Sequence, residues 1–513
     1  MRRLALPLLS ALALAAPRTP LAAQLAPQQP EPLRRAAETI AEADVRRRIG
    51  VIAHDSMMGR DTPSPGLEKT ARWVADQLQS FGLKPGGDSG TFFQRYTIAT
   101  TRFNAGASSV VLRAGNATAT ARFDTDARYA EGGTPARPVT GDVVLLGGRL
   151  DQRAIEGAAL RGRVVLFVMD YTKPVVPQAE LLQVAYGQGP AALAIISNRD
   201  SAGFAQRLRQ QGLMALTAPV YDRPAIPAVE VREPVFVPVL RAAGVDLARV
   251  RASTVPEVRP LAGATATLTL RDTVLQSVTA PNTIGILEGS DPVLKNEYVF
   301  FTAHMDHIGI TRGAPDSINN GADDDASGTV GVVELAEAFS RPGARPKRSL
   351  VFMTVSGEEK GLWGSEWYAE HPTVPLAQTV ADINMDMIGR NWKDTIVAIG
   401  QEHSDLGATL ARVNAAHPEL GIRVIDDIWP EEQFYVRSDH FNFARKGVPI
   451  LFFFNGVHRD YHRPSDEPAK IDAEKEARVL RMVYWIGQEV ANAAARPQWN
   501  EESRKRIVEG VGH

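Results

Sequence analysis

The sequence predicts an α/β fold in which a mostly parallel sheet is flanked by helices and is interrupted by a β-rich insert. The first observation is that strand-like and helix-like segments alternate from Asn282 to the C-terminus, an order typical of parallel sheets. The second is that four apolar runs in this part have the length and composition of strands buried on both faces. The third is a block from about 127 to 260, rich in short β-like runs and proline, which has the texture of a separate small domain.

Composition limits the classes of function. The 513 residues, of which 44% are hydrophobic, suffice for several domains. Because 57 Lys and Arg nearly balance 59 Asp and Glu, the net charge of −2 gives no general attraction to nucleic acid or anionic membranes. The absence of cysteine excludes disulfides, thiolate nucleophiles and cysteine-ligated metals. A bound metal would therefore have to use His, Asp and Glu.

The N-terminus has the pattern of a secretory signal peptide at residues 1–23. Arg2 and Arg3 precede the apolar run Leu4–Ala16, and small residues follow, which predicts cleavage after Ala23. The run is too short to span a bilayer comfortably, and an uncleaved anchor or a disordered tail is the alternative. Residues 24–32, rich in Pro and Gln, are predicted to be a flexible lead-in. We expect a secreted or periplasmic protein without a stable membrane span after cleavage.

The other elements follow in chain order. Residues 33–83 have the composition and apolar spacing of helices, and Thr91–Thr101 is predicted to be a strand. In the middle block, Val143–Leu146 and Val164–Met169 are β-like, and Thr265–Leu270 alternates as a strand beyond it. The predicted organisation is a first segment of the main domain at 33–126, the insert at 127–260, a second segment of the main domain at 261–498, and a charged, loosely held tail at 499–513.

The four apolar runs carry potential metal ligands at or near their ends. They are Tyr298–Ala303, Ser349–Val355, Val380–Met387 and Val448–Phe454. In open α/β sheets, ligands bind beyond the carboxyl ends of the strands, so side chains that are distant in the sequence are expected to meet at one sheet edge. The candidates, in chain order, are His304, Asp306, Glu358, Glu359, Asp386, Tyr461 and His462.

These residue types fit a pair of zinc ions. Zn²⁺ accepts His nitrogen and carboxylate oxygen at about 2.0–2.2 Å, and two such ions about 3.5–4 Å apart need a bridging carboxylate. Two terminal ligands per ion would come from His304, Glu359, Asp386 and His462. The bridge would come from Asp323–Asp325, of which one or two members could instead cap the helix that follows.

Three further side chains have roles that their chemistry suggests. Asp306 lies two residues after His304, on the same side of an extended chain, and can orient that ring. Glu358 is adjacent to a candidate ligand and can take a proton from water, as a hydrolase requires. Tyr461 can donate its hydroxyl to a developing oxyanion. These three are the candidate catalytic residues.

The sequence resembles the dizinc exopeptidases of clan MH, the family of secreted bacterial leucyl aminopeptidases and glutamate carboxypeptidase II. The early segment DSMMGRDTPSPG (Asp55–Gly66) fits this family, and the middle block is similar to a protease-associated domain. Five further motifs occur in the family's order: AHMDHIG (Ala303–Gly309), NGADDDASG (Asn320–Gly328), SGEEKGLWGS (Ser356–Ser365), NMDMIGR (Asn384–Arg390) and YHRPSDEPAKID (Tyr461–Asp472).

The resemblance implies the zinc exopeptidase fold, with a central mixed, mostly parallel sheet and an inserted protease-associated domain. It also implies two Zn²⁺ per chain, although other divalent ions could use the same donors. The implied ligand sets are His304, Asp324 and Asp386 for one ion, and Asp324, Glu359 and His462 for the other. Asp324 is the implied bridge, with Asp323 or Asp325 as alternatives.

The resemblance further implies peptide substrates, attacked by metal-bound hydroxide with Glu358 as general base and then general acid. Tyr461 falls where some members carry an oxyanion-stabilising tyrosine and others do not. Among the other histidines, His458 and His440 compete with His462, although His440 and Asp439 are expected to be structural. The remaining neighbour, His307, is expected to be structural or to lie on the cleft wall.

The segment Ile428–His440 precedes the fourth apolar run and is predicted to form a specificity wall. Glu431 or Glu432 would favour a substrate amine, whereas Arg437 would favour a carboxylate. Family frequency favours an aminopeptidase, and a glutamate carboxypeptidase-like exopeptidase is the alternative. The alternatives from other classes are a glutaminyl cyclase-like transferase and an inactive binding or receptor homologue.

Overall fold

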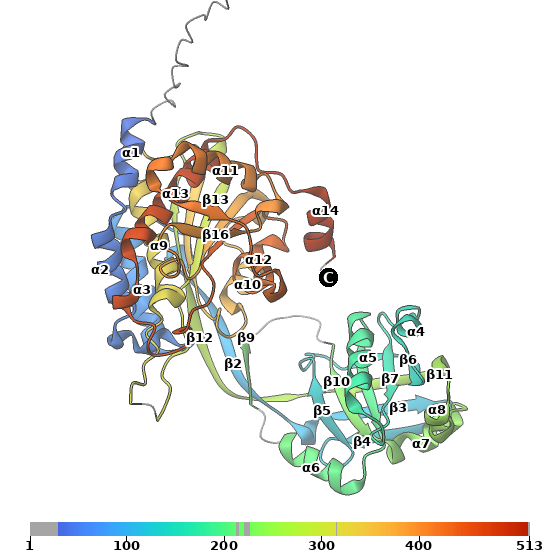
Figure 1. Cartoon of the computed structure of the whole chain (residues 1–513). Coiled ribbons are helices and arrows are strands. Elements are labelled where there is room, and N and C mark those ends of the chain that lie inside the picture. Colours follow the sequence, from blue (N-terminus) through green and yellow to red (C-terminus); the bar gives the residue numbers. More distant parts are fainter. Residues whose placement is uncertain (1–28, 212–214, 220–225, 314, 511–513) are drawn as a thin grey trace, which may run out of the picture.

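The computed structural model describes residues 29–510, except 212–214, 220–225 and 314. The predicted signal peptide and the first part of the predicted lead-in lie outside the described residues. The described chain forms two lobes, each built on its own sheet (Figure 1). The long strands β2 (Phe93–Phe103) and β12 (Asp272–Leu287) belong to the larger lobe and extend toward the smaller one.

The larger lobe contains a ten-stranded sheet in the described chain, ordered β17-β16-β18-β15-β13-β14-β12-β2-β9, with β1 paired to β12. Its centre is parallel, from β18 through β15 and β13 to β14. Antiparallel strands flank the centre, with β12 beside β14 and β16 beside β18. The bounds are β1 (Lys84–Pro85), β9 (Ala215–Pro219), β13 (Tyr298–His304), β14 (Ser349–Val355), β15 (Thr379–Met385), β16 (Thr395–Ile399), β17 (Arg423–Ile425) and β18 (Ile450–Phe454).

The sequence correctly predicted the four central strands, and the α/β fold is confirmed. Every residue of β13, β14, β15 and β18 is buried except Tyr298, which is half-buried. Burial on both faces explains why these strands read as continuous apolar runs. Two boundaries were wrong by two residues. The strand predicted from Val448 begins at Ile450, and the one predicted to end at Met387 ends at Met385, so Asp386 lies just beyond it.

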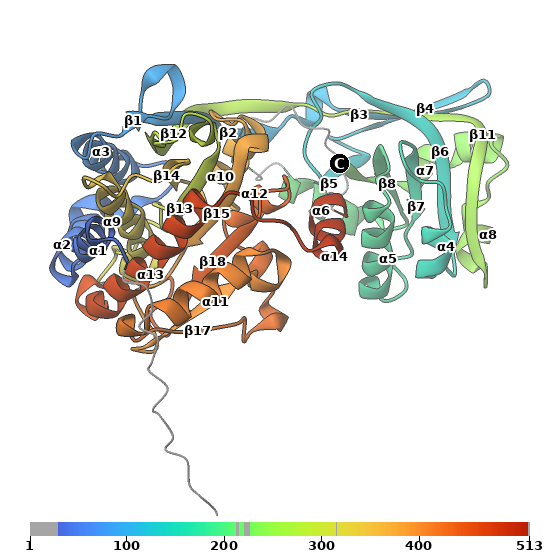
Figure 2. The same ribbon diagram turned by 90° about the horizontal axis from the view of Figure 1, so that it is seen from above.

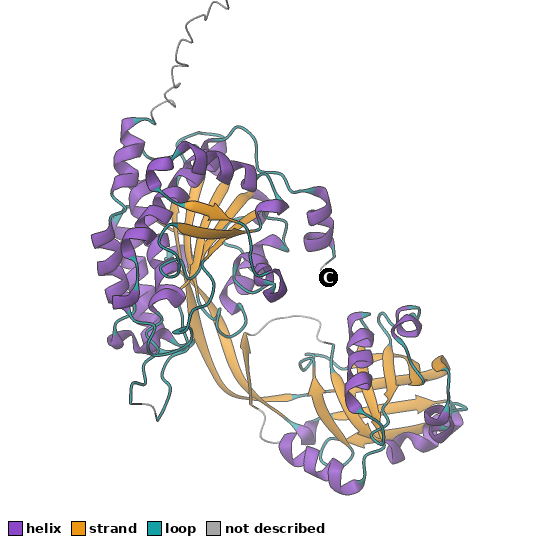
Figure 3. Cartoon of the chain, in the orientation of Figure 1, coloured by secondary structure: helices purple, strands orange, loops and turns teal. Residues whose placement is uncertain are grey.

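Helices cover both faces of this sheet, as the purple ribbons around the orange strands show (Figure 3). On one face, helices pack with the sheet around a large apolar core, and Figure 2 shows α1, α2, α3, α9 and α13 together on that side. The bounds on this face are α1 (Glu31–Glu38), α2 (Glu42–Ile52), α3 (Pro65–Ser80), α9 (Gly328–Ser340), α11 (Leu406–Ala416) and α13 (Ala473–Asn492). The other face carries α10 (Trp363–Glu370) and α12 (His440–Ala444).

No helix among the described residues is long and apolar enough to cross a membrane.

The smaller lobe is built on an eight-stranded sheet in the described chain, ordered β4-β3-β11-β6-β7-β8-β10-β5. Strands β6, β7, β8 and β10 are parallel, and the others are antiparallel to their neighbours. Its strands are β3 (Ser109–Ala114), β4 (Ala117–Arg122), β5 (Ala127–Glu131), β6 (Val139–Gly148), β7 (Val164–Val168), β8 (Ala192–Ser197), β10 (Ala228–Arg232) and β11 (Pro256–Thr269). Its helices are α4 (Gln152–Glu156), α5 (Val175–Gly187), α6 (Ser201–Gln211), α7 (Glu233–Ala242) and α8 (Leu247–Ala252).

The predicted boundaries of the insert differ from the pairing of the strands. Strands β3 and β4 precede residue 127, and β11 continues to Thr269, yet all three belong to the smaller sheet. Conversely, β9 falls between residues 127 and 260 but pairs with β2 in the larger sheet. The predicted boundaries lie where the residue composition and the pattern of apolar runs change. Which sheet a strand joins depends on partners that are distant in the sequence. The protease-associated character of this lobe stays a prediction.

The prediction of a loosely held tail at 499–513 was wrong for its described part. The indole of Trp499 donates a hydrogen bond to the carbonyl of Gly447 at 2.9 Å. Beyond it lie α14 (Glu501–Arg504) and a short π-helical turn in which Ile507 is buried in the core beside α12. A few apolar contacts and one indole hydrogen bond therefore fix a segment whose composition is mostly charged.

The buried acid Asp382 in β15 makes folding stability depend on pH. Its Oδ1 accepts a hydrogen bond from Thr302 at 2.8 Å, its Oδ2 has no partner, and burial raises its pKa to about 8. The folded chain holds this proton while the unfolded chain releases it near pH 4, so this contribution to stability is lost as pH rises toward 8.

We therefore expect Asp382→Asn to flatten the pH dependence of unfolding. Relative to the wild type, the variant should gain up to roughly 3–4 kcal/mol between pH 5 and pH 8, because each pH unit is worth about 1.36 kcal/mol. Urea unfolding of both proteins at the two pH values measures this difference. Parallel pH profiles would show that Asp382 is ionised in the folded protein at both pH values.

Candidate metal centre

The carboxyl ends of the central strands and the loops after them bring the predicted residues together. His304 is the last residue of β13, Asp386 directly follows β15, and Glu358 and Glu359 lie in the loop after β14. His462 and Tyr461 lie in the loop after β18, while Asp324 lies in the turn that precedes α9. Parallel strands end at the same edge, so five chain segments supply one site.

Two clusters of potential ligands share the carboxylate of Asp324. In the first, His304 Nε2 lies 3.3 Å from Asp324 Oδ1 and 3.7 Å from Asp386 Oδ1. In the second, His462 Nε2 lies 3.2 Å from Asp324 Oδ2 and 3.0 Å from Glu359 Oε2. Donors of one tetrahedral zinc lie about 3.5 Å apart, so these nitrogen and oxygen atoms fit metal ions.

The second cluster also contains His307, which sequence reasoning placed on the cleft wall or in a structural role. Its Nδ1 lies 2.7 Å from Glu359 Oε1 and 3.6 Å from Asp324 Oδ2. Its Nε2 is buried without a hydrogen-bond partner. The only signal for it in the sequence was a second histidine in the same motif as His304, directly after a buried strand.

The three consecutive aspartates, Asp323, Asp324 and Asp325, make different contacts in the turn before α9. Asp325 accepts backbone hydrogen bonds from His304, Gly328 and Met387, and Asp323 accepts one from Gly389. Only the middle residue, Asp324, belongs to both metal-binding clusters. The geometry therefore favours Asp324 over its neighbours as the shared carboxylate.

The start of this turn requires glycine. Gly321 has a φ of +55°, and a Cβ there would lie 2.2 Å from the carbonyl oxygen of Asp324 and 2.6 Å from the ring of His307. From the other side, Asp466 Oδ2 accepts hydrogen bonds from the backbone of Asp323 and Asp324 at 2.9 and 3.2 Å. The sequence motif contained Asp466, but only the structure shows that it holds the turn.

Asp306 and Glu358 are connected beside the first cluster. Asp306 Oδ1 accepts a hydrogen bond from the backbone N–H of Glu358 at 3.3 Å. The predicted contact of Asp306 with the His304 ring is made through its backbone oxygen, 3.2 Å from Nδ1, while its carboxylate lies at 3.6 Å. The carboxylate of Glu358 itself reaches the cleft, with Oε2 4.0 Å from His304 Nε2.

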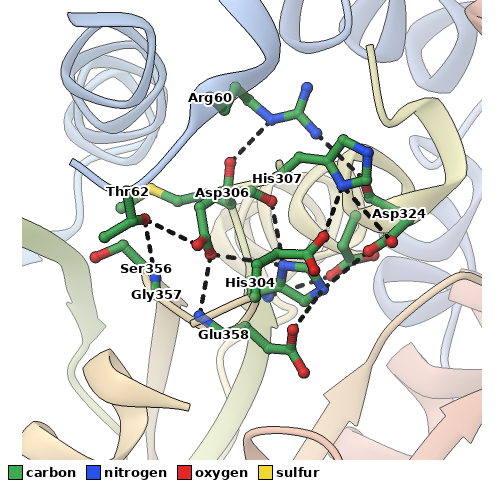
Figure 4. A network of polar contacts seen from close by, with 12 residues as sticks. Arg60, Thr62, His304, Asp306, His307, Asp324, Ser356, Gly357 and Glu358 are labelled. Carbon is green, nitrogen blue, oxygen red and sulfur yellow. Dashed lines mark hydrogen bonds and ion pairs between the residues drawn. The ribbon is translucent and has the colours of Figure 1, made fainter. Parts of the chain in front are cut away.

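An N-terminal segment contacts these loops through Arg60 and Thr62 (Figure 4). The guanidinium of Arg60 is fully buried and donates to the backbone carbonyls of Ile52, Met305, Asn320 and Gly321 at 2.6–3.1 Å. The hydroxyl of Thr62 donates to Asp306 Oδ2 at 2.8 Å and accepts from the backbone of Gly357 at 3.0 Å. Residues about 240 positions before the first motif thus fix the loops that carry it. Sequence reasoning missed both side chains.

Burial and the neighbouring charges shift the pKa values of acids and imidazoles in and beside the two clusters. Burial raises the pKa of Glu358 well above its usual value, although His304 opposes the shift. The pKa of His462 is raised to about 10, since hydrogen bonds with Asp324 and Glu359 outweigh burial. Burial also raises the pKa of Asp386. His462 therefore holds a proton near neutral pH when no cation is present, and a bound cation would have to displace it.

A cleft opens onto the first cluster. Its polar side comprises His304, Asp324, Glu358, Asp386, Ser438 and Tyr461, and its apolar side comprises Met387, Phe434, Phe452 and Phe454. The ring of Tyr461 stacks on His462, with centroids 3.9 Å apart. A lining that combines these polar groups with an aromatic wall, formed by Phe434, Phe452 and Phe454, suits a substrate that has one apolar side chain and a polar reacting group.

Of the predicted substrate-binding residues, only Arg437 lines this cleft. Its guanidinium lies over the ring of Phe434 and is paired with Glu432 at 3.0 Å. Glu431 and Glu432 are exposed and do not line it, so the structure does not bring them to the site. His440 Nε2 donates a hydrogen bond to the carbonyl of Tyr435 at 2.7 Å, and His458 contacts Asp323 at 3.2 Å, which leaves His462 in the second cluster.

The site has two features of metal-dependent hydrolases. Imidazole and carboxylate groups are clustered as possible metal ligands, and a further glutamate, Glu358, lies in the cleft without belonging to either cluster. Residues 282–486 match the model of peptidase family M28. The matched segment carries both ligand clusters and Glu358.

Individual relatives share the same part of the chain. Leupeptin-inactivating enzyme 1 of Streptomyces exfoliatus is 30% identical over 205 residues, which are 40% of this chain and 42% of that protein. A probable leucine aminopeptidase of Arthroderma benhamiae is 27% identical over 210 residues, which are 39% and 56% of the two chains. This chain thus spans about half the length of these relatives or less. The aminopeptidase of Aneurinibacillus sp. strain AM-1 is 20% identical, with a TM-score of 0.47 over 90% of this chain and 97% of that one.

Proposed function

We propose that the protein is a zinc-dependent exopeptidase of the aminopeptidase type, which releases N-terminal residues from peptides. The observation that carries the proposal is the pair of ligand clusters that share Asp324, with Glu358 free in the adjoining cleft. The M28 match of the same segment supports the reaction class.

Two zinc ions would be held by the proposed sets. One set is His304, Asp324 and Asp386, and the other is Asp324, Glu359 and His462, with His307 as a further donor to the second. When bound, such ions polarise a carbonyl and make water a stronger nucleophile at neutral pH. Imidazole and carboxylate donors without thiolate also accept cobalt or manganese.

The side chains around the clusters would move the protons. Glu358 takes the proton from the attacking water and delivers it to the nitrogen of the leaving amine, because its carboxylate lines the cleft and burial raises its affinity for a proton. Asp306 fixes His304 and the backbone of Glu358. Tyr461, which lines the same cleft, donates its hydroxyl to the oxyanion.

The charges of the cleft favour a substrate amine over a carboxylate. Asp324, Glu358 and Asp386 all line the cleft, and together they would attract an α-ammonium group. The one cationic side chain in the lining, Arg437, is already paired with Glu432. This balance supports an aminopeptidase over a glutamate carboxypeptidase-like enzyme. The aromatic wall favours an apolar N-terminal residue.

The test is a comparison of substrates with and without chelator. We expect release of arylamine from Leu-arylamide, little reaction with N-blocked peptides or with C-terminal glutamate peptides, and loss of activity in chelator that zinc restores. Preferred release of C-terminal glutamate would support the carboxypeptidase alternative. Cyclisation of N-terminal glutamine would support the transferase, and binding without turnover would support a receptor homologue.

We also propose that the protein acts outside the cytoplasm, as the signal-like N-terminus suggests. Expression of the full chain in a bacterial host and N-terminal sequencing of the exported form would test this. We expect the mature chain to begin at Gln24.

Thr62 would matter for the rate although it touches no substrate. We expect Thr62→Val to lower kcat about 10–100-fold with little change in KM or metal content, because Asp306 and the backbone of Gly357 lose their common partner. Thr62→Ser should restore most of the rate. Steady-state kinetics with metal analysis measures both. Wild-type kcat in the valine variant would show that the hydroxyl of Thr62 is not required.

A further inference from the structure

A series of aromatic rings leads from the cleft to the solvent. Phe434 and Phe454 line the cleft, and Trp429 contacts both rings edge-on, with centroid distances of 5.7 and 6.1 Å. Trp392 stacks on Trp429 with centroids 6.0 Å apart and an angle of 18° between the planes. Trp392 is 43% exposed, so the series ends at the surface.

The outer part of this series is held in place by the loop after β18. The ring of Trp429 lies against Gly456, where a Cβ would come within 2.5 Å of it. The side chain of Asn391, next to Trp392, donates to the carbonyl of Asn455 at 2.6 Å. The loop after β15 and the segment before α12 are therefore fixed to the same two residues, Asn455 and Gly456, and the two indoles are prearranged.

Further apolar side chains are exposed beside the indoles in the sequence. Ile428 precedes Trp429 and is 48% exposed, and Val457 follows Gly456 and is 50% exposed. Single exposed apolar residues are common, whereas a connected apolar surface next to a cleft marks a binding surface. Tryptophan is a frequent anchor of such surfaces because it buries a large area with few rotatable bonds.

We propose that Trp392 and Trp429, with Val457, bind an apolar side chain of the peptide substrate beyond the residue that occupies the cleft. This inference rests on the proposed function and names a substrate class: peptides with a second apolar residue downstream of the N-terminus. The occupant is a substrate segment because the strip is continuous with the aromatic wall of the cleft. A second copy of the chain on the same surface is an alternative that the test separates.

The spacing of the rings indicates which residue of the substrate is bound. Two centroid steps of about 6 Å separate the cleft wall from Trp392. An extended peptide advances about 3.3 Å per residue. A side chain two to four residues after the N-terminal one, at position 3, 4 or 5, would therefore reach Trp392.

The experiment uses the full-length protein and hexapeptides of N-terminal Leu followed by Ala, with one Phe moved from position 2 to position 6. For the wild type we expect kcat/KM to peak with Phe at positions 3–5, about tenfold above the all-Ala peptide, which is about 1.4 kcal/mol. In Trp392→Ala the peak should fall below about twofold, and Trp392→Phe should keep most of it. Val293→Ala, at a 72% exposed apolar residue outside the site, should keep the wild-type profile.

Leu-arylamide, which is too short to reach Trp392, separates this inference from the proposed function. Its hydrolysis by the wild type supports the aminopeptidase activity whatever the peptide series shows. A flat peptide series for the wild type, or an unchanged peak in Trp392→Ala, would overturn the proposal. So would a dimer of the wild type in sedimentation velocity that dissociates in Trp392→Ala, since the strip would then be covered by a second copy.

Discussion

Glu358→Gln is expected to lower kcat for Leu-arylamide about 10²–10⁴-fold while the protein folds and binds metal as before. The amide keeps the shape of the side chain but cannot accept a proton from water or return it to the leaving amine. The ligand clusters do not include Glu358, so zinc content should stay at the wild-type value. Steady-state kinetics and metal analysis of the same preparation measure the two effects.

A matched control is Glu370→Gln, at a glutamate of α10 that pairs with Lys446 and belongs to neither ligand cluster. It should keep wild-type kinetics. Loss of zinc in Glu358→Gln would make Glu358 a ligand rather than a base. Full activity of that variant would remove Glu358 from the proton-transfer role altogether.

Asp324→Asn is expected to lower hydrolysis as strongly as Glu358→Gln, but through loss of bound metal rather than loss of proton transfer. Its carboxylate contacts His304, His307 and His462, and it belongs to both ligand clusters. An amide offers one neutral oxygen in place of two that share a negative charge, so at least one ion would lose a ligand and both would lose part of their attraction to the site. We expect bound zinc to fall well below the wild-type value and hydrolysis to be lost, as measured by metal analysis after dialysis against a fixed free zinc concentration.

The neighbouring aspartates provide the control for this prediction. Asp323→Asn and Asp325→Asn remove carboxylates that accept backbone hydrogen bonds and belong to neither cluster. Both variants should retain zinc, although with lower stability. If Asp323→Asn or Asp325→Asn lost both ions and Asp324→Asn kept them, the shared ligand would be a different aspartate from the one proposed.

The sequence predicted the parallel centre of the main sheet because burial on both faces leaves a continuous apolar pattern, as in Phe300, Phe301 and Phe352. The boundaries of the smaller lobe could not be found in the same way. Strand β11 alternates like an ordinary strand, and only its pairing with β3 and β6 assigns it to the smaller sheet. Pairing of this kind depends on segments more than 100 residues apart, which local patterns do not encode.

The candidate ligands were predictable because imidazoles and carboxylates directly after apolar strands are unusual, as at His304 and Glu359. The residues that hold them were not. Arg60 acts through backbone carbonyls and Thr62 through one hydroxyl, and neither residue type marks a site in a sequence. The contribution of His307 depended on the path of the chain after β13, since residues three apart in an extended strand point to opposite faces.

The central claim is that two metal ions share Asp324, and anomalous diffraction from a crystal grown with zinc tests it most directly. Data collected on both sides of the zinc absorption edge locate zinc without reference to the surrounding side chains. The account predicts two peaks, one beside His304 and Asp386 and one beside Glu359 and His462, each about 2.0–2.2 Å from an oxygen of Asp324. A single peak, or two peaks without Asp324 between them, would contradict it.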